Sequence, residues 1–172
     1  MFEIYGEFDS IEELNSTASE MKAAENEEAL KELCEENGID PEDAEDYYDG
    51  ATSELATPLM AAVGKIKVES LDLKLKGVLL DWTEELIIMA SEWEEFARAI
   101  RRKGKDLAGY IALLAESGYE NRAVVDKRIV DKTKKIKSIA GGHEFAIGIP
   151  DKKTRRQLAE KYYMKGENHV CI

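Results

Sequence analysis

Cysteine, proline and histidine are scarce in this sequence. Its 172 residues include three prolines, two histidines (His143 and His169) and two cysteines (Cys34 and Cys171). Cysteines so far apart predict neither a disulfide framework nor a paired-cysteine zinc site, which is typical of a reducing compartment. Neither histidine has another strong ligand at a zinc or di-iron spacing, so we expect no metal and no other cofactor.

Long apolar segments are also missing. No run of about 18 uncharged apolar residues occurs, and the N-terminal MFEIYGEFD has neither the basic start nor the apolar stretch of a signal peptide. A composition of 44% hydrophobic and 35% charged residues is typical of a soluble globular protein rather than a disordered one. We therefore expect a cytoplasmic protein that spans no membrane and forms a single domain over residues 1–172.

Signatures of catalysis are absent as well. The chain has no GxxxxGK[S/T], GxGxxG or GxSxG motif. The acid-rich stretch from Asp40 to Asp49 lacks the central glycine and the terminal glutamate of a calcium loop. The residues from Asp72 to Lys74 match the D-x-K pattern of a restriction-type nuclease, but no second carboxylate is positioned to hold a metal with them. We therefore predict that the protein is not an enzyme.

Negative charge is in excess and unevenly distributed. Acidic and basic residues number 36 and 24, and the net charge of −12 is too acidic for ordinary duplex binding by the whole chain. Residues 1–60 hold 19 acids and 2 bases, whereas residues 101–172 hold 9 acids and 17 bases. The acidic part can bind a basic cleft, and the basic part can bind phosphates or an acidic protein face. Alternatively, these charges are solvated helix faces, and the two halves attract each other.

Short helices are predicted in the acidic part, residues 1–60. Ser10 and Glu13 form a capping box, Asn37-Gly38 is a helix C-terminal signal, and Asp40-Pro41 is an N-terminal one. The predicted helices span about 11–24, 27–36, 41–49 and 53–63.

The hydrophobic period changes in the remaining part, residues 61–172. Residues 65–76 alternate between apolar and polar, which favours an extended chain. One long central helix is predicted over 78–102, because apolar residues recur there at spacings of 3 and 4. These residues are Leu79, Trp82, Leu86, Met89, Trp93, Phe96 and Ile100. We interpret this stripe as a core spine, and a homodimer seam is the alternative. Gly104 ends this helix, and another is expected over 105–117.

The sequence pattern from residue 123 onward predicts helices together with a small sheet. We expect a helix over 123–134, a β-hairpin over 136–149 that turns at Gly141-Gly142, and a last helix over 152–164. A lone hairpin is unstable, so a third strand is expected from residues 2–4 or 66–68. The tail from Gly166 is expected to be loose. The predicted fold class is mainly α (α+β).

Clustered carboxylates form the first candidate surface. Since their mutual repulsion is costly, we interpret them as a binding surface for a basic partner. Carboxylates at this density can imitate a duplex, which carries about one negative charge per 1.7 Å of its axis. The candidates are Glu35, Glu36, Glu42, Asp43, Glu45, Asp46 and Asp49.

Three basic clusters form the second candidate surface, for nucleic acid or for a protein partner. Together they can form one phosphate-binding face, although no aromatic motif for base stacking accompanies them. Part of the first cluster can be structural, because cations stabilise a helix C-terminus. The clusters are Arg101, Arg102, Lys103 and Lys105; then Lys127, Arg128, Lys132, Lys134, Lys135 and Lys137; and finally Lys152, Lys153, Arg155 and Arg156.

Five segments of the chain resemble a group of small proteins from mobile elements and phages of gut Clostridia, which includes type II anti-CRISPR proteins, the inhibitors of Cas9. The segments are GEFDSIEELN, LCEENGIDPEDAEDYYDG, ELATPLMAAVGKIKVE, AIRRKGKDLAGYIA and GIPDKKTRRQLAEKYYMKG. The resemblance implies a non-enzymatic inhibitor, in the cytoplasm of a bacterial host cell, that binds Cas9 with or without guide RNA. It would hinder the engagement or cleavage of target DNA. The resemblance brings no residue-level functional motif.

The charge pattern agrees with this resemblance. Cas9 holds nucleic acid in a basic channel, which an acidic mimic of DNA can occupy, and this contact should be sensitive to salt. The basic part could also touch guide RNA or double-stranded DNA. The alternative hypothesis is a DNA-binding accessory protein of a mobile element, acting in conjugation or replication through the basic C-terminal face.

Overall fold

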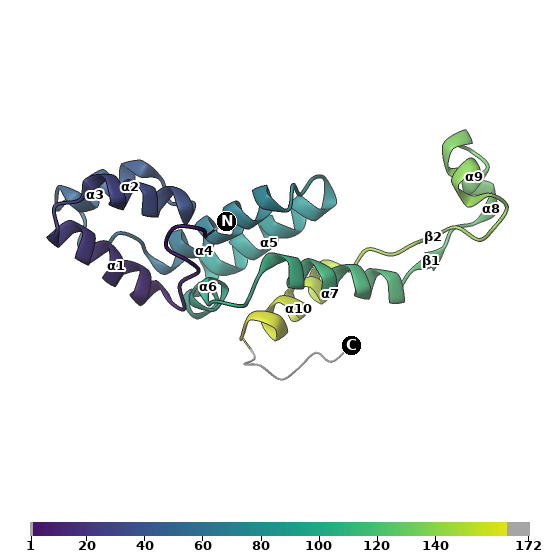
Figure 1. Ribbon diagram of the computed structural model, residues 1–172. Helices are drawn as coiled ribbons and strands as arrows, with labels where there is room; N and C mark the ends of the chain where they lie inside the picture. The colour runs from purple at the N-terminus through teal and green to yellow at the C-terminus, as the bar shows by residue number, and fades with distance from the viewer. Residues whose placement is uncertain (1, 165–172) are drawn as a thin grey trace.

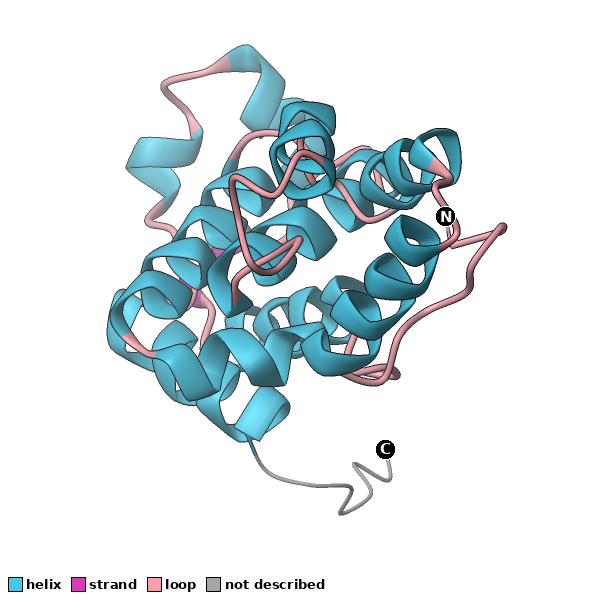
Figure 2. Ribbon diagram, turned by 90° about the vertical axis from the view of Figure 1, so that its left-hand side faces the viewer, coloured by secondary structure: helices cyan, strands magenta, loops and turns pink. Residues whose placement is uncertain are grey.

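The computed structural model describes residues 2–164 of the chain. Within this range the protein has ten helices and a two-stranded antiparallel sheet, so the predicted fold class is confirmed (Figures 1 and 2). The tail from Gly166, with His169 and Cys171, lies outside the described residues. Figure 1 shows three parts in a row: a lobe formed by α1 to α3, a central group of helices, and a thin arm that ends in α8 and α9.

The N-terminal lobe confirms the first three predicted helices. Ser10 Oγ accepts the N–H of Glu13 at 3.1 Å, and Asn26 and Asp40 cap the next two helices in the same way. The lobe has its own apolar core, which includes Leu14, Leu30 and Leu33. Its helices are α1 (Ile11–Ala23), α2 (Glu27–Glu36) and α3 (Pro41–Tyr48).

A second core lies in the central unit. Trp82, Leu86, Phe96, Tyr110 and Tyr163 are among its buried residues. The helices around this core are α4 (Pro58–Asp72), α5 (Val78–Glu92), α6 (Glu94–Arg101), α7 (Leu107–Glu120) and α10 (Lys152–Met164). The last helix has the predicted bounds.

The predicted extended segment over 65–76 is wrong, because residues up to Asp72 belong to α4. The fourth helix accordingly begins at Pro58, capped by Thr57, rather than at residue 53. The period-two pattern misled because α4 buries two charged residues and exposes one leucine, so its apolar residues do not form a clear helical stripe. Lys65 and Glu69 are buried in this helix, whereas Leu71 is 71% exposed.

The single long helix over 78–102 is also wrong. Trp93 has an extended backbone (φ −148°, ψ 105°), which separates α5 from α6 and lets α6 pack against α4. The apolar stripe continues across this break, and Trp82, Leu86, Met89, Phe96 and Ile100 are all buried inside the chain. The stripe is therefore the core spine that we expected. Trp93 is the most exposed residue of the stripe, at 38%; the homodimer seam stays an untested alternative.

The predicted helix over 123–134 and the glycine-turn hairpin are replaced by the arm, residues 122–149. Its strands, β1 (Ala123–Val124) and β2 (Ala146–Ile147), pair with Ala123 opposite Ile147. Between them lie α8 (Lys127–Val130) and α9 (Lys134–Ala140), and Gly141 ends α9 with a left-handed backbone (φ 55°). No third strand joins this pair within residues 2–164. Figure 1 shows the arm extending away from α7 and α10.

Candidate functional site

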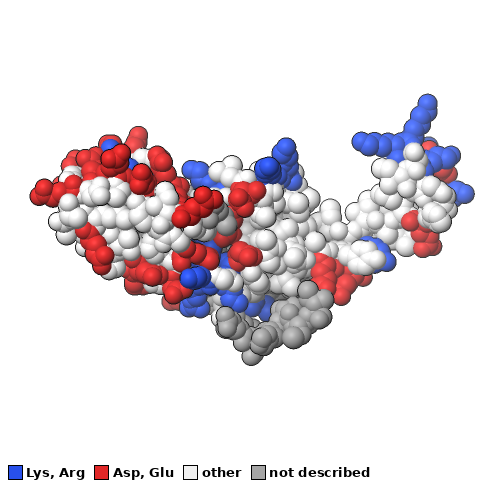
Figure 3. All heavy atoms as spheres, viewed as in Figure 1, with Lys and Arg blue, Asp and Glu red and all other residues white. Residues whose placement is uncertain are grey.

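The acidic lobe, residues 2–56, carries the strongest charge of the molecule. It contains 19 acidic residues and 2 lysines, and Figure 3 shows many red side chains distributed along this end, with few blue ones. Both lysines are engaged within the lobe. Lys22 donates to the Tyr47 carbonyl, and Lys31 Nζ lies 2.8 Å from carboxylate oxygens of both Glu27 and Glu45. The remaining carboxylates are therefore not neutralised by bases of the lobe itself.

Some of the predicted acidic residues have structural tasks. The Glu36 carboxylate accepts the backbone N–H groups of Ile4 and Tyr5, at 2.7 and 2.9 Å, and so holds the N-terminal segment on α2. Glu45 joins α3 to α2 through Lys31, and Asp43 is only partly exposed. The predicted residues that remain as free surface charges are Glu35, Glu42, Asp46 and Asp49, all of which are exposed.

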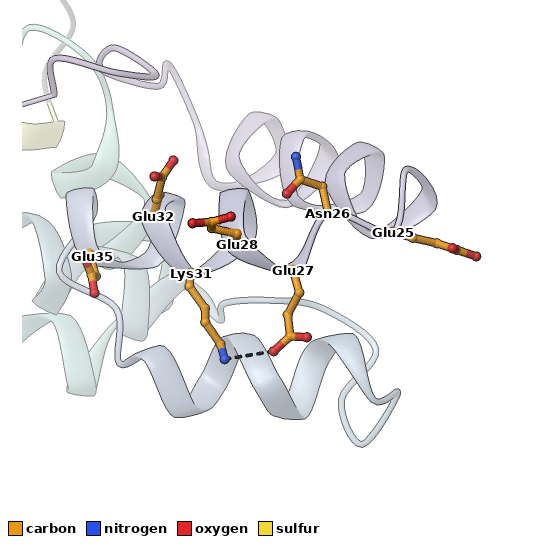
Figure 4. Close-up of a pocket in the computed structure, with 7 residues that line it drawn as sticks. All are labelled: Glu25, Asn26, Glu27, Glu28, Lys31, Glu32 and Glu35. Atoms are coloured by element: carbon orange, nitrogen blue, oxygen red, sulfur yellow. Dashed lines mark ion pairs between the residues drawn. The ribbon is translucent and has the colours of Figure 1, made fainter.

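The structure adds acidic residues on α2 that the sequence analysis missed. A shallow hollow on this helix is lined by Glu25, Asn26, Glu27, Glu28, Lys31, Glu32 and Glu35 (Figure 4). Glu28, Glu32 and Glu35 belong to α2, and Glu25 lies in the turn before that helix. The spacings of 4 and 3 put Glu28, Glu32 and Glu35 on one side of α2, so the sequence did hold the signal.

The three basic clusters do not form one face, contrary to the expectation. On α10, Arg156 pairs with Glu85 of α5 at 3.2 Å and with Glu92 at 2.5 Å, and Lys152 lies 3.6 Å from Glu85. Arg155 donates to the Pro150 carbonyl at 2.8 Å. Acids of the central unit thus neutralise most of this cluster, and only Lys153 remains exposed without such a contact among the described residues.

The cluster that begins at Arg101 is divided between core and surface. Arg101 is 1% exposed, and its guanidinium donates to Asn37 Oδ1 at 2.7 Å. Burial lowers its pKa from the usual value. Lys105 is partly buried, with Nζ 5.3 Å from the centre of the Tyr162 ring. Arg102 and Lys103 are exposed.

The middle cluster lies at the tip of the arm, where Figure 3 shows a group of blue side chains apart from the rest. Lys132, Lys134 and Lys135 are exposed and form no ion pair within the described residues. Lys137 pairs with Asp131 at 3.1 Å, and Arg128 pairs with Asp126 at 3.0 Å. The arm therefore carries a cation-rich surface that is largely free.

A buried polar junction links the lobe to the central unit, and the sequence analysis did not find it. Lys65 Nζ lies 2.6 Å from a Glu7 carboxylate oxygen, donates to the Arg102 carbonyl at 2.8 Å, and lies 3.7 Å from Glu69. The Glu69 carboxylate accepts the N–H of Leu107 at the start of α7. Burial raises the pKa of Glu69 to about 7, although Lys65 opposes this shift. These residues hold four segments together.

Evidence for a reactive or metal-binding site is lacking in the described part of the chain. Residues 2–164 contain no group of three or more His, Cys, Asp and Glu side chains that could hold a metal ion. Cys34 is buried, and burial raises the pKa of its thiol to about 12, so it is not a nucleophile at neutral pH. No helix among these residues is long and apolar enough to cross a membrane.

Comparisons with protein-family models, with curated proteins and with solved structures find no match to this chain. A function is therefore inferred from the chemistry of the acidic lobe and of the basic arm.

Proposed function

We propose that this protein is an inhibitor that binds Cas9, with or without its guide RNA, and hinders its engagement of target DNA without catalysing a reaction. The observation that carries the proposal is the acidic lobe, whose two lysines are both engaged within the lobe while most of its carboxylates face solvent. The resemblance of five segments to anti-CRISPR proteins points to the same partner.

A lobe of this kind suits a protein that must reach a nucleic-acid channel. Cas9 holds its guide–target duplex and the displaced strand in positively charged grooves. The exposed carboxylates of α2 and α3 offer a rigid array of negative charge to such a groove, because both helices are fixed by their caps and by the Lys31 pairs. Charge complementarity also speeds the encounter, so association should slow as salt rises.

Neutralising the lobe is the direct test. The combined variant Glu28→Gln, Glu35→Gln, Glu42→Gln, Asp46→Asn and Asp49→Asn removes five exposed charges and keeps the side-chain shapes. We expect capture of guide-loaded Cas9 to weaken at least about tenfold, or about 1.4 kcal/mol, with a smaller dependence on salt. Pull-down and titration across a panel of Cas9 orthologues measure this.

A matched control neutralises five exposed glutamates of the central unit: Glu84, Glu95, Glu116, Glu120 and Glu160. It changes the net charge equally, so it should keep near wild-type capture if the lobe carries the contact. The proposal fails if no orthologue is captured by the wild type, or if both variants lose the same affinity.

The alternative, a DNA-binding accessory protein of a mobile element, would use basic residues instead. A shift of a DNA duplex by the wild type, together with no capture of any Cas9, would favour that alternative.

A further inference from the structure

The arm is the least explained part of the fold. Val130 is its one side chain classed as buried, so the arm adds little apolar burial to the stability of the protein. Five aliphatic side chains of the arm are instead half exposed or more: Val124, Ile129, Ile139, Ile147 and Ile149. Exposed apolar side chains in one small segment are typical of a macromolecular interface.

Cations are concentrated on the same segment. The arm carries seven Lys and Arg against three Asp and Glu, a net charge of +4, whereas the rest of the chain carries −16. Six of the seven lie within residues 127–137. Lysine binds phosphate as a point charge, and regularly spaced phosphates are the common polyanion that suits such a cluster.

The position of the arm separates it from the acidic lobe. Figure 1 shows the two at opposite ends of the molecule, with α7 leading from the central unit toward the arm. A helix of 14 residues is roughly 21 Å long at 1.5 Å per residue. Since salt screens exposed charges beyond about 8 Å at physiological ionic strength, the lobe does not cancel the field of the tip. The net charge of −12 therefore does not prevent binding there.

The shape and residue types of the arm select among nucleic acids. A two-stranded ribbon or a single helix fits the major groove of DNA, which is about 12 Å wide. The arm contains one residue of the types Phe, Tyr and Trp, which is Phe145, and its side chain is partly buried. The arm therefore offers no aromatic surface on which unpaired bases could stack. We propose that the arm is a separate binding site for the phosphate backbone of a double-stranded nucleic acid.

The test uses the full chain and short labelled duplexes of DNA and of RNA, with fluorescence anisotropy as the measurement. If about four phosphates are contacted, affinity should fall on the order of 100-fold between about 50 and about 200 mM salt. Equal binding of both duplexes would mean that the arm recognises only the phosphate backbone. A preference for one duplex would show whether the natural ligand is DNA or RNA.

Charge reversal at the tip should remove this binding. We expect the variant Lys132→Glu, Lys134→Glu, Lys135→Glu to bind at least about tenfold more weakly at low salt, with a smaller salt slope. The matched control, Lys67→Glu, Lys76→Glu, Lys161→Glu, reverses three exposed lysines elsewhere and should keep most of the affinity. All six side chains are exposed, so each variant should fold like the wild type, which circular dichroism would check.

Two outcomes would overturn the inference: no binding of either duplex at low salt, or an equal loss in both variants. The assay contains no Cas9, so its result is independent of the proposed inhibitor function. If the arm variant loses Cas9 capture while the wild type binds no duplex, the arm contacts protein instead of nucleic acid.

Discussion

Replacing Gly64 with alanine is expected to lower the free energy of unfolding by about 3 kcal/mol. Gly64 lies in the middle of α4, where glycine costs a helix about 1 kcal/mol relative to alanine. The packing explains why glycine is there. A Cβ on Gly64 would overlap with the carbonyl oxygen of Asn37 and would lie 3.2 Å from the carbonyl of Gly38. These are backbone atoms, so they cannot yield as a flexible side chain could.

The same substitution should loosen the joint between the two cores. Asn37 accepts a hydrogen bond from buried Arg101, so displacing it would leave that cation without its partner. Urea denaturation measures the loss, and the melting temperature should fall by roughly 6 to 12 °C. Lys67→Ala, on the exposed side of α4, serves as the control and should change stability little. Equal stability of Gly64→Ala and wild type would contradict the close contact.

The stability of the protein should decrease as pH rises from about 5 to about 7, and Glu69→Gln should remove part of that decrease. Burial raises the pKa of Glu69 to about 7, from its usual value near 4.5. Between these values the folded protein holds one more proton than the unfolded chain at this site. Each pH unit therefore costs about 1.4 kcal/mol of unfolding free energy, and the whole window costs on the order of 3 kcal/mol.

The Glu69→Gln variant isolates this contribution from those of the other acids. The new amide can still accept the Leu107 N–H but has no charge to bury, and Lys65 keeps its contacts with Glu7 and the Arg102 carbonyl. At pH 8 the variant should be more stable than wild type, and near pH 5 the two should be similar. Denaturant titrations at several pH values measure the difference, with exposed Glu84→Gln as the control. A difference between wild type and variant that does not change with pH would show that Glu69 has an ordinary pKa.

Local sequence signals predicted the helices that depend on local contacts. Ser10 and Asp40 accept hydrogen bonds from backbone N–H groups three and two residues away, so the first and third helices of the lobe could be placed from the sequence. Asp151 caps the last helix in the same way, because its carboxylate accepts the N–H of Thr154.

Predictions failed where contacts between distant segments decide the conformation. The break at Trp93 preserves the spacing of the apolar stripe, so periodicity alone cannot reveal it. Ala123 pairs with Ile147, which lies 24 residues away, and no local sequence pattern predicts that pairing. Lys65 and Glu69 were not predicted in the core because charged side chains are seldom buried unless they are paired. Glu7, which pairs with Lys65, and Leu107, whose N–H binds Glu69, both lie far away in the sequence.

The sequence by itself determined the helical character of the protein, the caps of its lobe and the segregation of acids from bases, because these follow from residue type and near neighbours. Only the tertiary structure decided which charges are free. Arg101 is buried, and Arg155 and Arg156 are held at Pro150 and Glu85, whereas lysines 132, 134 and 135 stand exposed on the arm. Burial and ion pairing join residues that are distant in the chain, so composition cannot distinguish a cation that binds a partner from one that supports the fold.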